Sequence, residues 1–280
     1  MKPQALGLVL EGGALRGQYT AGVLDAFLEK GVEFPYVVGV SAGASIACSY
    51  VSKQHGRNRV IVDTYRHDRR YLSLTNWLTT GSLFGMDFIY DEIPHKLVPF
   101  DFKTFEASAT RFVTVCTDVE SGRAVYFEKE GEDHLTVLKA SASMPFLSPV
   151  VEYRGRLLLD GALADSLPWA HAVKQGFSRN VVILTRPAGY RKRAPQTWPA
   201  RLLYGRYPRL VEAINTRWRQ YNASLAAIEA AETAGDALVI RPSVNLKIGR
   251  TEGSVAKLGQ LYELGRTDGA AALKNPRFFR

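Results

Sequence analysis

Short apolar runs alternate with helical patterns from the start of the chain. The run Ala5–Leu10 predicts a buried strand, and from Tyr19 to Lys30 apolar residues recur at helical spacing. The run Tyr36–Val40 predicts a second strand, and Ala42–Lys53 predicts a second helix. A strand–turn–helix unit that occurs twice in succession is typical of a parallel sheet covered by helices.

Further strands and helices follow from the same patterns. Residues 58–105 predict helices and loops at the edge of the sheet, and residues 111–116 and 123–127 predict a β-hairpin that turns at Ser121-Gly122. The other expected strands lie at 156–159, 180–185 and 237–240, and the other expected helices at 134–142, 167–176, 208–234 and 255–266. Prolines between residues 186 and 207 predict a loop there.

The composition fits a single α/β domain over residues 1–280 with a mainly parallel central sheet. Apolar residues make up 46% of the chain, which is enough for a sizeable core, and no repeat or linker is evident.

Cys48 and Cys116 lie in apolar runs and are expected to be buried thiols of a reducing compartment. No secretory leader is evident, and the uncharged stretch Phe34–Ser52 fits a strand–turn–helix unit better than a membrane span because it contains Pro35. We therefore expect a soluble, cytoplasmic protein.

Positive charge is concentrated in one segment. The net charge of the chain is +9, and between Arg179 and Arg219 ten Lys or Arg residues stand against the single acid Glu212. This segment therefore accounts for the whole excess of positive charge. Tyr and Trp residues are interleaved with the basic ones. The pattern is compatible with nucleic-acid binding, with an anionic membrane surface or with a solvated basic face.

The sequence Gly39-Val40-Ser41-Ala42-Gly43 has the G-x-S-x-G pattern of a nucleophile elbow. It joins the second predicted strand to the second predicted helix, so the backbone turns sharply at Ser41. Gly39 and Gly43 leave space where side chains would collide, and the helix N-terminus favours negative charge that develops on Ser41. The alternative is that Ser41 is only a helix-capping residue.

A serine nucleophile needs donors that hold the oxyanion. Gly12, Gly13 and Ala14 follow the first predicted strand, and their small side chains allow the backbone to present N–H groups to a carbonyl oxygen. A phosphate-binding loop is the rival interpretation, but the run lacks the residue order of a dinucleotide-binding loop or a P-loop. Three roles are open for Arg16: it supports this loop, it contacts an anionic substrate, or it lies in solvent as a charge of the first helical turn.

The nucleophile also needs a base. Asp160 ends a predicted strand and precedes Gly161, so its carboxylate is expected above the edge of the sheet, where the loops 11–17 and 39–43 also end. His171 follows Asp160 in the chain, but it lies within a predicted helix and fits a packing or surface role better. A Ser41–Asp160 dyad is therefore the preferred arrangement, and a turn aspartate without a catalytic role is the alternative.

In these motifs the chain resembles the patatin-like phospholipases, and most closely their bacterial members. The resemblance rests on Glu11–Gly17, Gly39–Gly43 and Asp160–Ala162, and a fourth block, Lys139–Pro145, is also similar. These blocks occur in the family's order and cover residues 5–185. Ala14 departs from the pattern, since the family often has a third glycine there. The resemblance does not extend to residues 186–280.

The resemblance implies a three-layer α/β/α fold and hydrolysis of lipid acyl esters without a metal or other cofactor. Ser41 would be the nucleophile, Asp160 the general base, and Gly12, Gly13 and Ala14 the oxyanion hole. The supporting residues would be Arg16, Gly17, Gly39, Gly43 and Gly161. The activity would be of the phospholipase A, lysophospholipase or carboxylesterase type.

Two alternatives to hydrolysis remain. An acyltransferase would use the same elbow, and a non-catalytic protein that binds lipid or nucleic acid would use only the scaffold. We expect residues 186–219 to guide the protein to an anionic membrane, peripherally at its inner face, and we do not favour nucleic acid as the partner.

Overall fold

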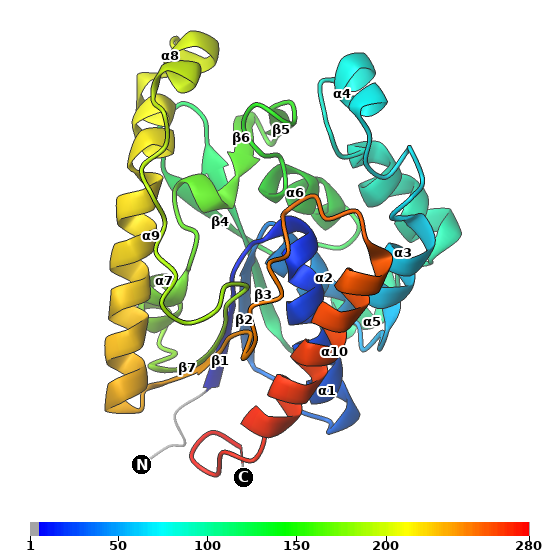
Figure 1. The fold of residues 1–280 in the computed structure, drawn as a ribbon, viewed down its shortest axis with the longest axis vertical. Helices are drawn as coiled ribbons and strands as arrows, with labels where there is room; N and C mark the ends of the chain where they lie inside the picture. The colour runs from blue at the N-terminus through cyan, green and yellow to red at the C-terminus, as the bar shows by residue number, and fades with distance from the viewer. Residues whose placement is uncertain (1–5, 280) are drawn as a thin grey trace.

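The computed structural model describes residues 6–279, in which eight strands form one sheet (Figure 1). The strands are β1 (Leu6–Leu10), β2 (Tyr36–Val40), β3 (Arg111–Asp118), β4 (Ala124–Glu128), β5 (Val151–Tyr153), β6 (Arg156–Asp160), β7 (Arg179–Ile183) and β8 (Ala237–Ile240). Their order is β5-β6-β3-β2-β1-β7-β8, and β4 also pairs with β3. The strands β3, β2, β1, β7 and β8 run parallel, whereas β4, β5 and β6 pair antiparallel. The expected, mainly parallel sheet is therefore confirmed.

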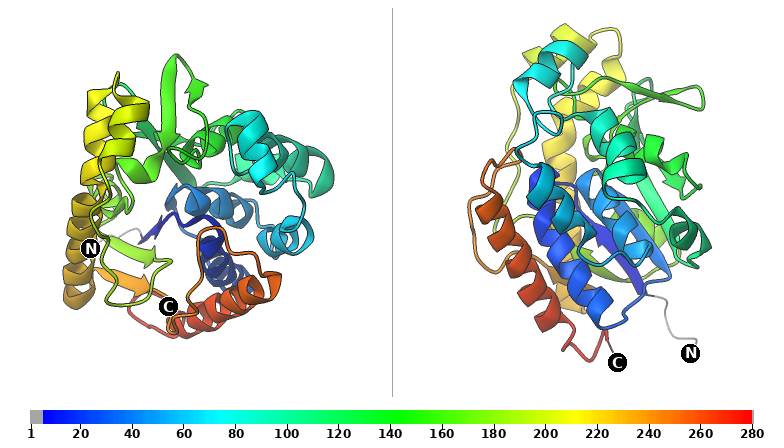
Figure 2. Two further views of the ribbon diagram at one scale, coloured as in Figure 1. Left: turned by 45° about the horizontal axis from the view of Figure 1, so that its top comes forward. Right: turned by 90° about the vertical axis from the view of Figure 1, so that its right-hand side faces the viewer.

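Helices cover both faces of this sheet. One face carries α1 (Gln18–Glu29), α2 (Ala42–Val51) and α10 (Val255–Ala272), and the other carries α7 (Trp169–Lys174) and α9 (Pro208–Ala234) (Figures 1 and 2). Alternate residues of β1 divide between the two layers, because Leu8 and Leu10 pack with the first set and Val9 with the second. The three-layer α/β/α fold is confirmed.

The remaining helices lie around the carboxyl ends of the parallel strands and beside β3. They are α3 (Arg57–Tyr65), α4 (Leu74–Thr80), the π-helix η2 (Phe88–Leu97), α5 (Phe102–Ala107), α6 (His134–Ser141) and α8 (Trp198–Tyr204). Two short 3₁₀-helices, η1 (Ala14–Gly17) and η3 (Gly161–Leu163), follow β1 and β6. Both α4 and α8 project from the end of the molecule that is uppermost in Figure 1.

Two strands share one edge of β3, and this arrangement positions the site. The strand β2 pairs with Arg111–Val115, and β6 pairs with Cys116–Asp118 on the same edge, because β4 occupies the opposite edge along 113–117. Val40 is paired with Val115, and Asp160 with the next residue, Cys116. The carboxyl ends of β2 and β6 therefore face each other on this edge, because the two strands run toward each other from opposite directions.

The structure corrects the sequence-based expectation at several points. The loop expected over residues 186–207 contains α8, in which Pro199 occupies the first helical turn, where proline is tolerated because its N–H is not needed. The strand β5 was not expected, and α10 continues to Ala272. The β3–β4 hairpin and the two buried, unpaired cysteines are as expected. In the described part of the chain no helix combines the length and hydropathy needed to cross a bilayer.

Candidate active site

Ser41 stands at a strained turn between β2 and α2. Its φ and ψ angles are 54° and −128°, a region that is costly for a residue with a side chain. Gly39 makes the turn possible, because a Cβ atom there would stand 2.7 Å from Ala44 Cα. The Ser41 hydroxyl makes no capping hydrogen bond to α2, and only 7% of the residue is exposed. In the structure the Ser41 side chain therefore does not act as a cap of α2.

The backbone of Ser41 is held by a hydroxyl from α6. Its N–H donates to Ser141 Oγ at 2.8 Å, and the Ser141 hydroxyl donates to the carbonyl oxygen of Val115 at 2.6 Å. Two residues further on, the backbone carbonyl oxygen of Ser143 accepts a hydrogen bond from the N–H of Asp160 at 2.8 Å. The last residue of α6 and the turn that follows it thus fix the backbone at both Ser41 and Asp160.

Asp160 lies beside Ser41 and is 5% exposed. Its Oδ1 accepts the N–H of Ala162 at 2.8 Å, so this carboxylate also caps η3. Burial raises the pKa of Asp160, and the positive charge of Arg217 and a hydrogen bond from Ser41 oppose that shift. A carboxylate with a raised pKa is a stronger base than an exposed aspartate.

The loop after β1 passes directly over Ser41. A Cβ atom on Gly12 would lie 3.0 Å from Ser41 Cβ, so the two backbones are in close contact. Among residues 6–279, no acceptor is found for the N–H groups of Gly12, Gly13 and Ala14, or for that of Ala42 at the start of α2. These groups are free to donate to an oxyanion next to Ser41.

The expected supporting residues lie around this loop. Gly43 packs against the carbonyl oxygen of Glu11, Gly17 against Ile46, and Gly161 against the backbone of β3. Only 8% of Arg16 is exposed, and its Nε has no hydrogen-bond partner among the described residues. Burial and the nearby Arg186 lower the pKa of Arg16 to about 10.

An apolar pocket opens on one side of Ser41. It runs between α2, α3, η2 and α6, and Ser41 and Ala14 stand at one end of it. The apolar side chains that line it include Leu15, Ile46, Val62, Phe84, Ile89 and Leu138. Its composition suits a hydrocarbon chain.

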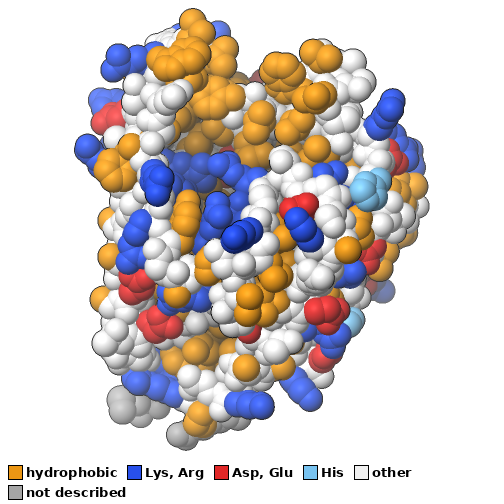
Figure 3. Space-filling view, in the orientation of Figure 1, with side chains coloured by type: hydrophobic (Ala, Val, Ile, Leu, Met, Phe, Trp, Pro, Cys, Tyr) orange, Lys and Arg blue, Asp and Glu red, His pale blue; other side chains and the backbone are white. Residues whose placement is uncertain are grey.

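A second pocket, which we call the cationic pocket, opens on the other side of Ser41. It also contains Asp160 and the loop residues Gly12 to Ala14. Six basic side chains line it, namely Arg16, Arg186, Lys192, Arg193, Arg217 and Arg250. Figure 3 shows Lys and Arg side chains gathered in the hollow on this face of the molecule. Part of the basic segment thus faces the site, not the outer surface that the sequence indicated.

The histidines lie elsewhere. His171 stacks on Tyr126 with ring centroids 3.6 Å apart. None of the five histidines, all within the described residues, lines either pocket at Ser41. A Ser–Asp–His triad on this geometry would have no histidine within reach of Ser41.

A family model described as patatin-like phospholipase matches residues 8–173, more than half of the chain. The protein belongs to the patatin-like phospholipase family. The match includes both Ser41 and Asp160. A second family model, a domain of unknown function (DUF6363), matches residues 207–277, which contain Arg217 and Arg250.

Curated relatives share parts of this patatin-like chain. The uncharacterized protein YjjU of Escherichia coli is 29% identical over 193 residues, which are 67% of this chain and 54% of YjjU. The lysophospholipase NTE1 of Kluyveromyces lactis is 22% identical over 286 residues, 94% of this chain but 19% of NTE1. The chain thus spans little more than half of YjjU and a much smaller share of NTE1.

One solved structure supports the fold. VipD from Legionella pneumophila has a TM-score of 0.50 at 15% identity, and the likeness covers 97% of this chain and 67% of VipD. At that identity the likeness concerns the arrangement of strands and helices alone.

Sequence reasoning missed two features of this patatin-like site. Ser141 lies in the block Lys139–Pro145, which resembles the family but gave no hint of a contact with Ser41. Arg250 carried no signal, because it lies outside the basic segment, in the loop before α10. Lys192 and Arg217 belong to the basic segment, but a charge count does not show which way a side chain points.

Proposed function

We propose that this patatin-like protein is a lipid acyl hydrolase that uses Ser41 as nucleophile and Asp160 as general base. The observation that carries the proposal is the position of Ser41, which stands at a strained elbow between an apolar pocket and a cationic pocket. The acyl chain enters the apolar pocket, and the polar part of the lipid lies in the cationic pocket. The lysophospholipases among the relatives support this class of substrate.

The reaction proceeds in two acyl transfers. Ser41 Oγ bonds to the ester carbonyl carbon while Asp160 accepts the hydroxyl proton, and the N–H groups of Gly12, Gly13 and Ala14 stabilise the oxyanion. The ester C–O bond then breaks, and the leaving alcohol takes the proton from Asp160. Water attacks the acyl-Ser41 ester with Asp160 again as base, which releases the fatty acid and restores the serine.

A fluorophosphonate probe tests the nucleophile. Labelling of the wild-type protein at one site, and its loss in Ser41→Ala, is the expected result. Ser121→Ala is the matched control, because Ser121 lies in the exposed β3–β4 turn and should not affect labelling. Labelling that persists in Ser41→Ala would overturn the assignment.

Product analysis tests the reaction type. Incubation with a short p-nitrophenyl ester and with lysophospholipids should release free fatty acid in the wild type and none in Ser41→Ala. Accumulation of a new acyl ester when an alcohol or a second lipid is added, without free fatty acid, would favour the acyltransferase alternative.

A further inference from the structure

The cationic pocket is more positive than a catalytic site for neutral esters requires. Its six basic side chains face only two carboxylates, Glu11 and Asp160. In the described part of the chain none of the six takes part in an ion pair with an acidic side chain. Cations that lie together without counter-ions are unfavourable unless an anion joins them.

The two carboxylates of the pocket already have partners. Glu11 accepts hydrogen bonds from the N–H and hydroxyl of Thr185 at 2.6 and 3.0 Å and from the hydroxyl of Tyr221 at 3.0 Å. Asp160 accepts the N–H of Ala162 and faces Ser41. Both still attract the nearby cations, since Asp160 and Glu11 act on Arg217 and Glu11 acts on Arg16. Two carboxylates leave most of the charge of six basic side chains uncompensated, and their hydrogen bonds leave little room for a cationic headgroup.

The aromatic rings of the pocket already have partners, and one of them, Phe146, packs on Tyr204 with ring centroids 5.6 Å apart. The guanidinium of Arg186 lies 4.5 Å from the centre of the Tyr190 ring, and that of Arg219 lies 5.2 Å from the Trp218 ring. A quaternary ammonium group such as choline needs open aromatic faces or a free carboxylate. The pocket therefore disfavours zwitterionic headgroups and favours anionic ones.

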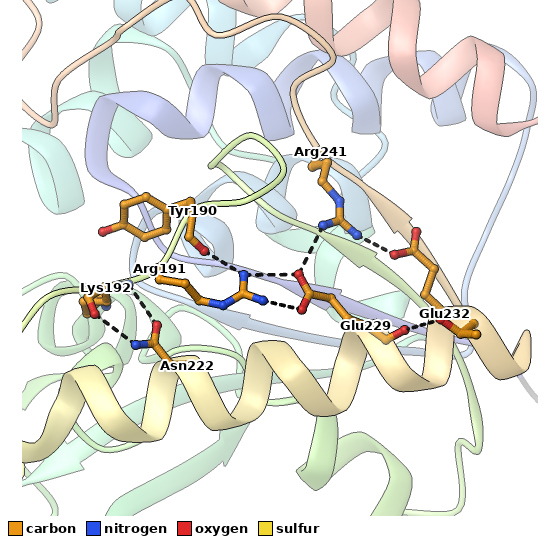
Figure 4. Close-up of polar contacts among 8 residues, drawn as sticks. Tyr190, Arg191, Lys192, Asn222, Glu229, Glu232 and Arg241 are labelled. Atoms are coloured by element: carbon orange, nitrogen blue, oxygen red, sulfur yellow. Dashed lines mark hydrogen bonds and ion pairs between the residues drawn. The ribbon is translucent and has the colours of Figure 1, made fainter.

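Ion pairs and hydrogen bonds outside the pocket hold the loop that carries Lys192 (Figure 4). Arg191 pairs with Glu229 of α9 at 2.6 Å, and the side chain of Asn222 accepts the Lys192 N–H at 2.8 Å and donates to its carbonyl oxygen at 2.9 Å. These contacts fix the loop backbone on α9. The Lys192 ammonium then lies 4.1 Å from the centre of the Tyr221 ring.

Burial and mutual repulsion destabilise the charged forms of the basic side chains in the pocket, and a bound anion would stabilise them. Burial and the positive charge of Arg217 lower the pKa of Lys192 to about 7. Burial also lowers the pKa of Arg217, whose Nε has only the Ser166 hydroxyl, at 3.4 Å, as a partner among the described residues. A phosphate group would supply charge and acceptors to both, and the arginine fork is well suited to bind it.

We propose that the cationic pocket binds the phosphate of the leaving alcohol, so that the preferred substrate is a single-chain acyl ester of a phosphomonoester such as glycerol 3-phosphate. The proposal rests on the function proposed above for Ser41. It assigns a role to the matched region of unknown function, which supplies Arg217 and Arg250. Residues 186–193 supply three more of the six cations.

Calorimetry tests the pocket without turnover. Ser41→Ala should bind glycerol 3-phosphate, and adding Lys192→Gln or Arg186→Gln should weaken binding at least 10-fold. Lys192→Arg should retain binding, and Arg209→Gln, an equal charge change at an exposed position of α9 outside the pocket, should have no effect. Absence of binding, or equal binding by Lys192→Gln and its parent, would overturn the proposal. So would inorganic phosphate binding as tightly as glycerol 3-phosphate, since this would indicate a site for free phosphate.

Turnover tests the substrate class. The wild type should cleave 1-acylglycerol 3-phosphate with at least 10-fold higher kcat/KM than the phosphocholine ester of the same chain, and Lys192→Gln should reduce that ratio at least 10-fold. An unchanged ratio, or a preference for phosphocholine, would overturn the proposal. If no ester is cleaved, the proposed function fails, whereas the calorimetry still decides whether the pocket binds phosphate. Equal melting temperatures show that the variants are folded.

Discussion

The backbone N–H of Ser41 donates a hydrogen bond to the hydroxyl of Ser141 at 2.8 Å, and these residues lie 100 positions apart in the chain. Because Ser141 also donates to the carbonyl of Val115, one buried hydroxyl joins the elbow, α6 and β3. Ser141 lines neither pocket at Ser41, so in the proposed mechanism it is a positioning residue. This contact determines how firmly the strained turn is held.

Ser141→Ala should reduce both stability and turnover. The change leaves the buried N–H of Ser41 without its partner, which costs about 1–3 kcal/mol in the free energy of unfolding. We expect kcat on a soluble ester to fall about 10-fold, with KM and the pH profile unchanged, because the base is intact. Ser143→Ala is the control, since that hydroxyl donates only to the nearby carbonyl oxygen of Lys139, at the end of α6, and should have a smaller effect. A shifted pH profile would contradict a positioning role.

Asp160 should set the acidic limb of the pH–rate profile. In the proposed mechanism Asp160 must be deprotonated, and burial raises its pKa, so kcat/KM should rise with pH through a midpoint above the ordinary aspartate value of 3.8. Asp160→Asn should lower kcat by roughly 10²–10⁴-fold. His171→Ala should change it less than about 3-fold, because His171 packs on Tyr126. The opposite ranking of the two variants would indicate a triad.

The same carboxylate should reduce stability at neutral pH. Because its pKa is raised in the folded state, its contribution to stability is complete below the unfolded pKa and is lost as pH rises through the folded pKa. Asp160→Asn should therefore raise the free energy of unfolding at pH 7 by about 1 kcal/mol, and the gain should shrink toward pH 4. Chemical denaturation at both pH values measures this. A variant that is less stable at pH 7 would show that burial of the charge is fully compensated.

Periodicity and the small-residue motifs were sufficient to predict the main strands, the three layers and the family. They could not predict that β6 runs antiparallel to β3 and thereby brings Asp160 to Ser41. That contact follows from β2 and β6 sharing one edge of β3. The inward direction of Lys192 was equally hidden, since it depends on the contact between Asn222 and the loop backbone. Local pattern determines which elements form, whereas long-range pairing determines which side chains meet.

Metal removal should leave activity unchanged. The proposed chemistry uses one carboxylate and backbone N–H groups, and the sequence around Ser41 contains no His or Cys cluster with ligand spacing. Dialysis against a chelator should not change kcat on a soluble ester by more than about 2-fold. A loss of activity that calcium or zinc restores would show that a cation takes part in the reaction.

The helices α4 and α8 should bring the protein to a lipid surface. On α8, Leu202 and Leu203 are 74% and 61% exposed. Hydrophobic side chains also cover the tips of both projections at the top of Figure 3. Phe146, which lines the cationic pocket, accepts a hydrogen bond from Trp77 of α4 and donates one to Tyr204 of α8. Both helices are therefore attached to the wall of the site, and a membrane that covers them would deliver lipid directly to it.

Vesicle sedimentation tests this docking. Binding should rise with the anionic lipid fraction and fall with salt, because each exposed basic residue near an acidic bilayer contributes roughly 1 kcal/mol within a Debye length. Arg201→Gln with Arg206→Gln should remove most of the salt dependence. Leu202→Asp with Leu203→Asp should lower binding at least 10-fold at any salt concentration, with activity on a soluble ester retained. Val173→Asp, an exposed apolar position on α7, is the control. If wild type and the double leucine variant bind vesicles equally, the two helices do not form the docking surface.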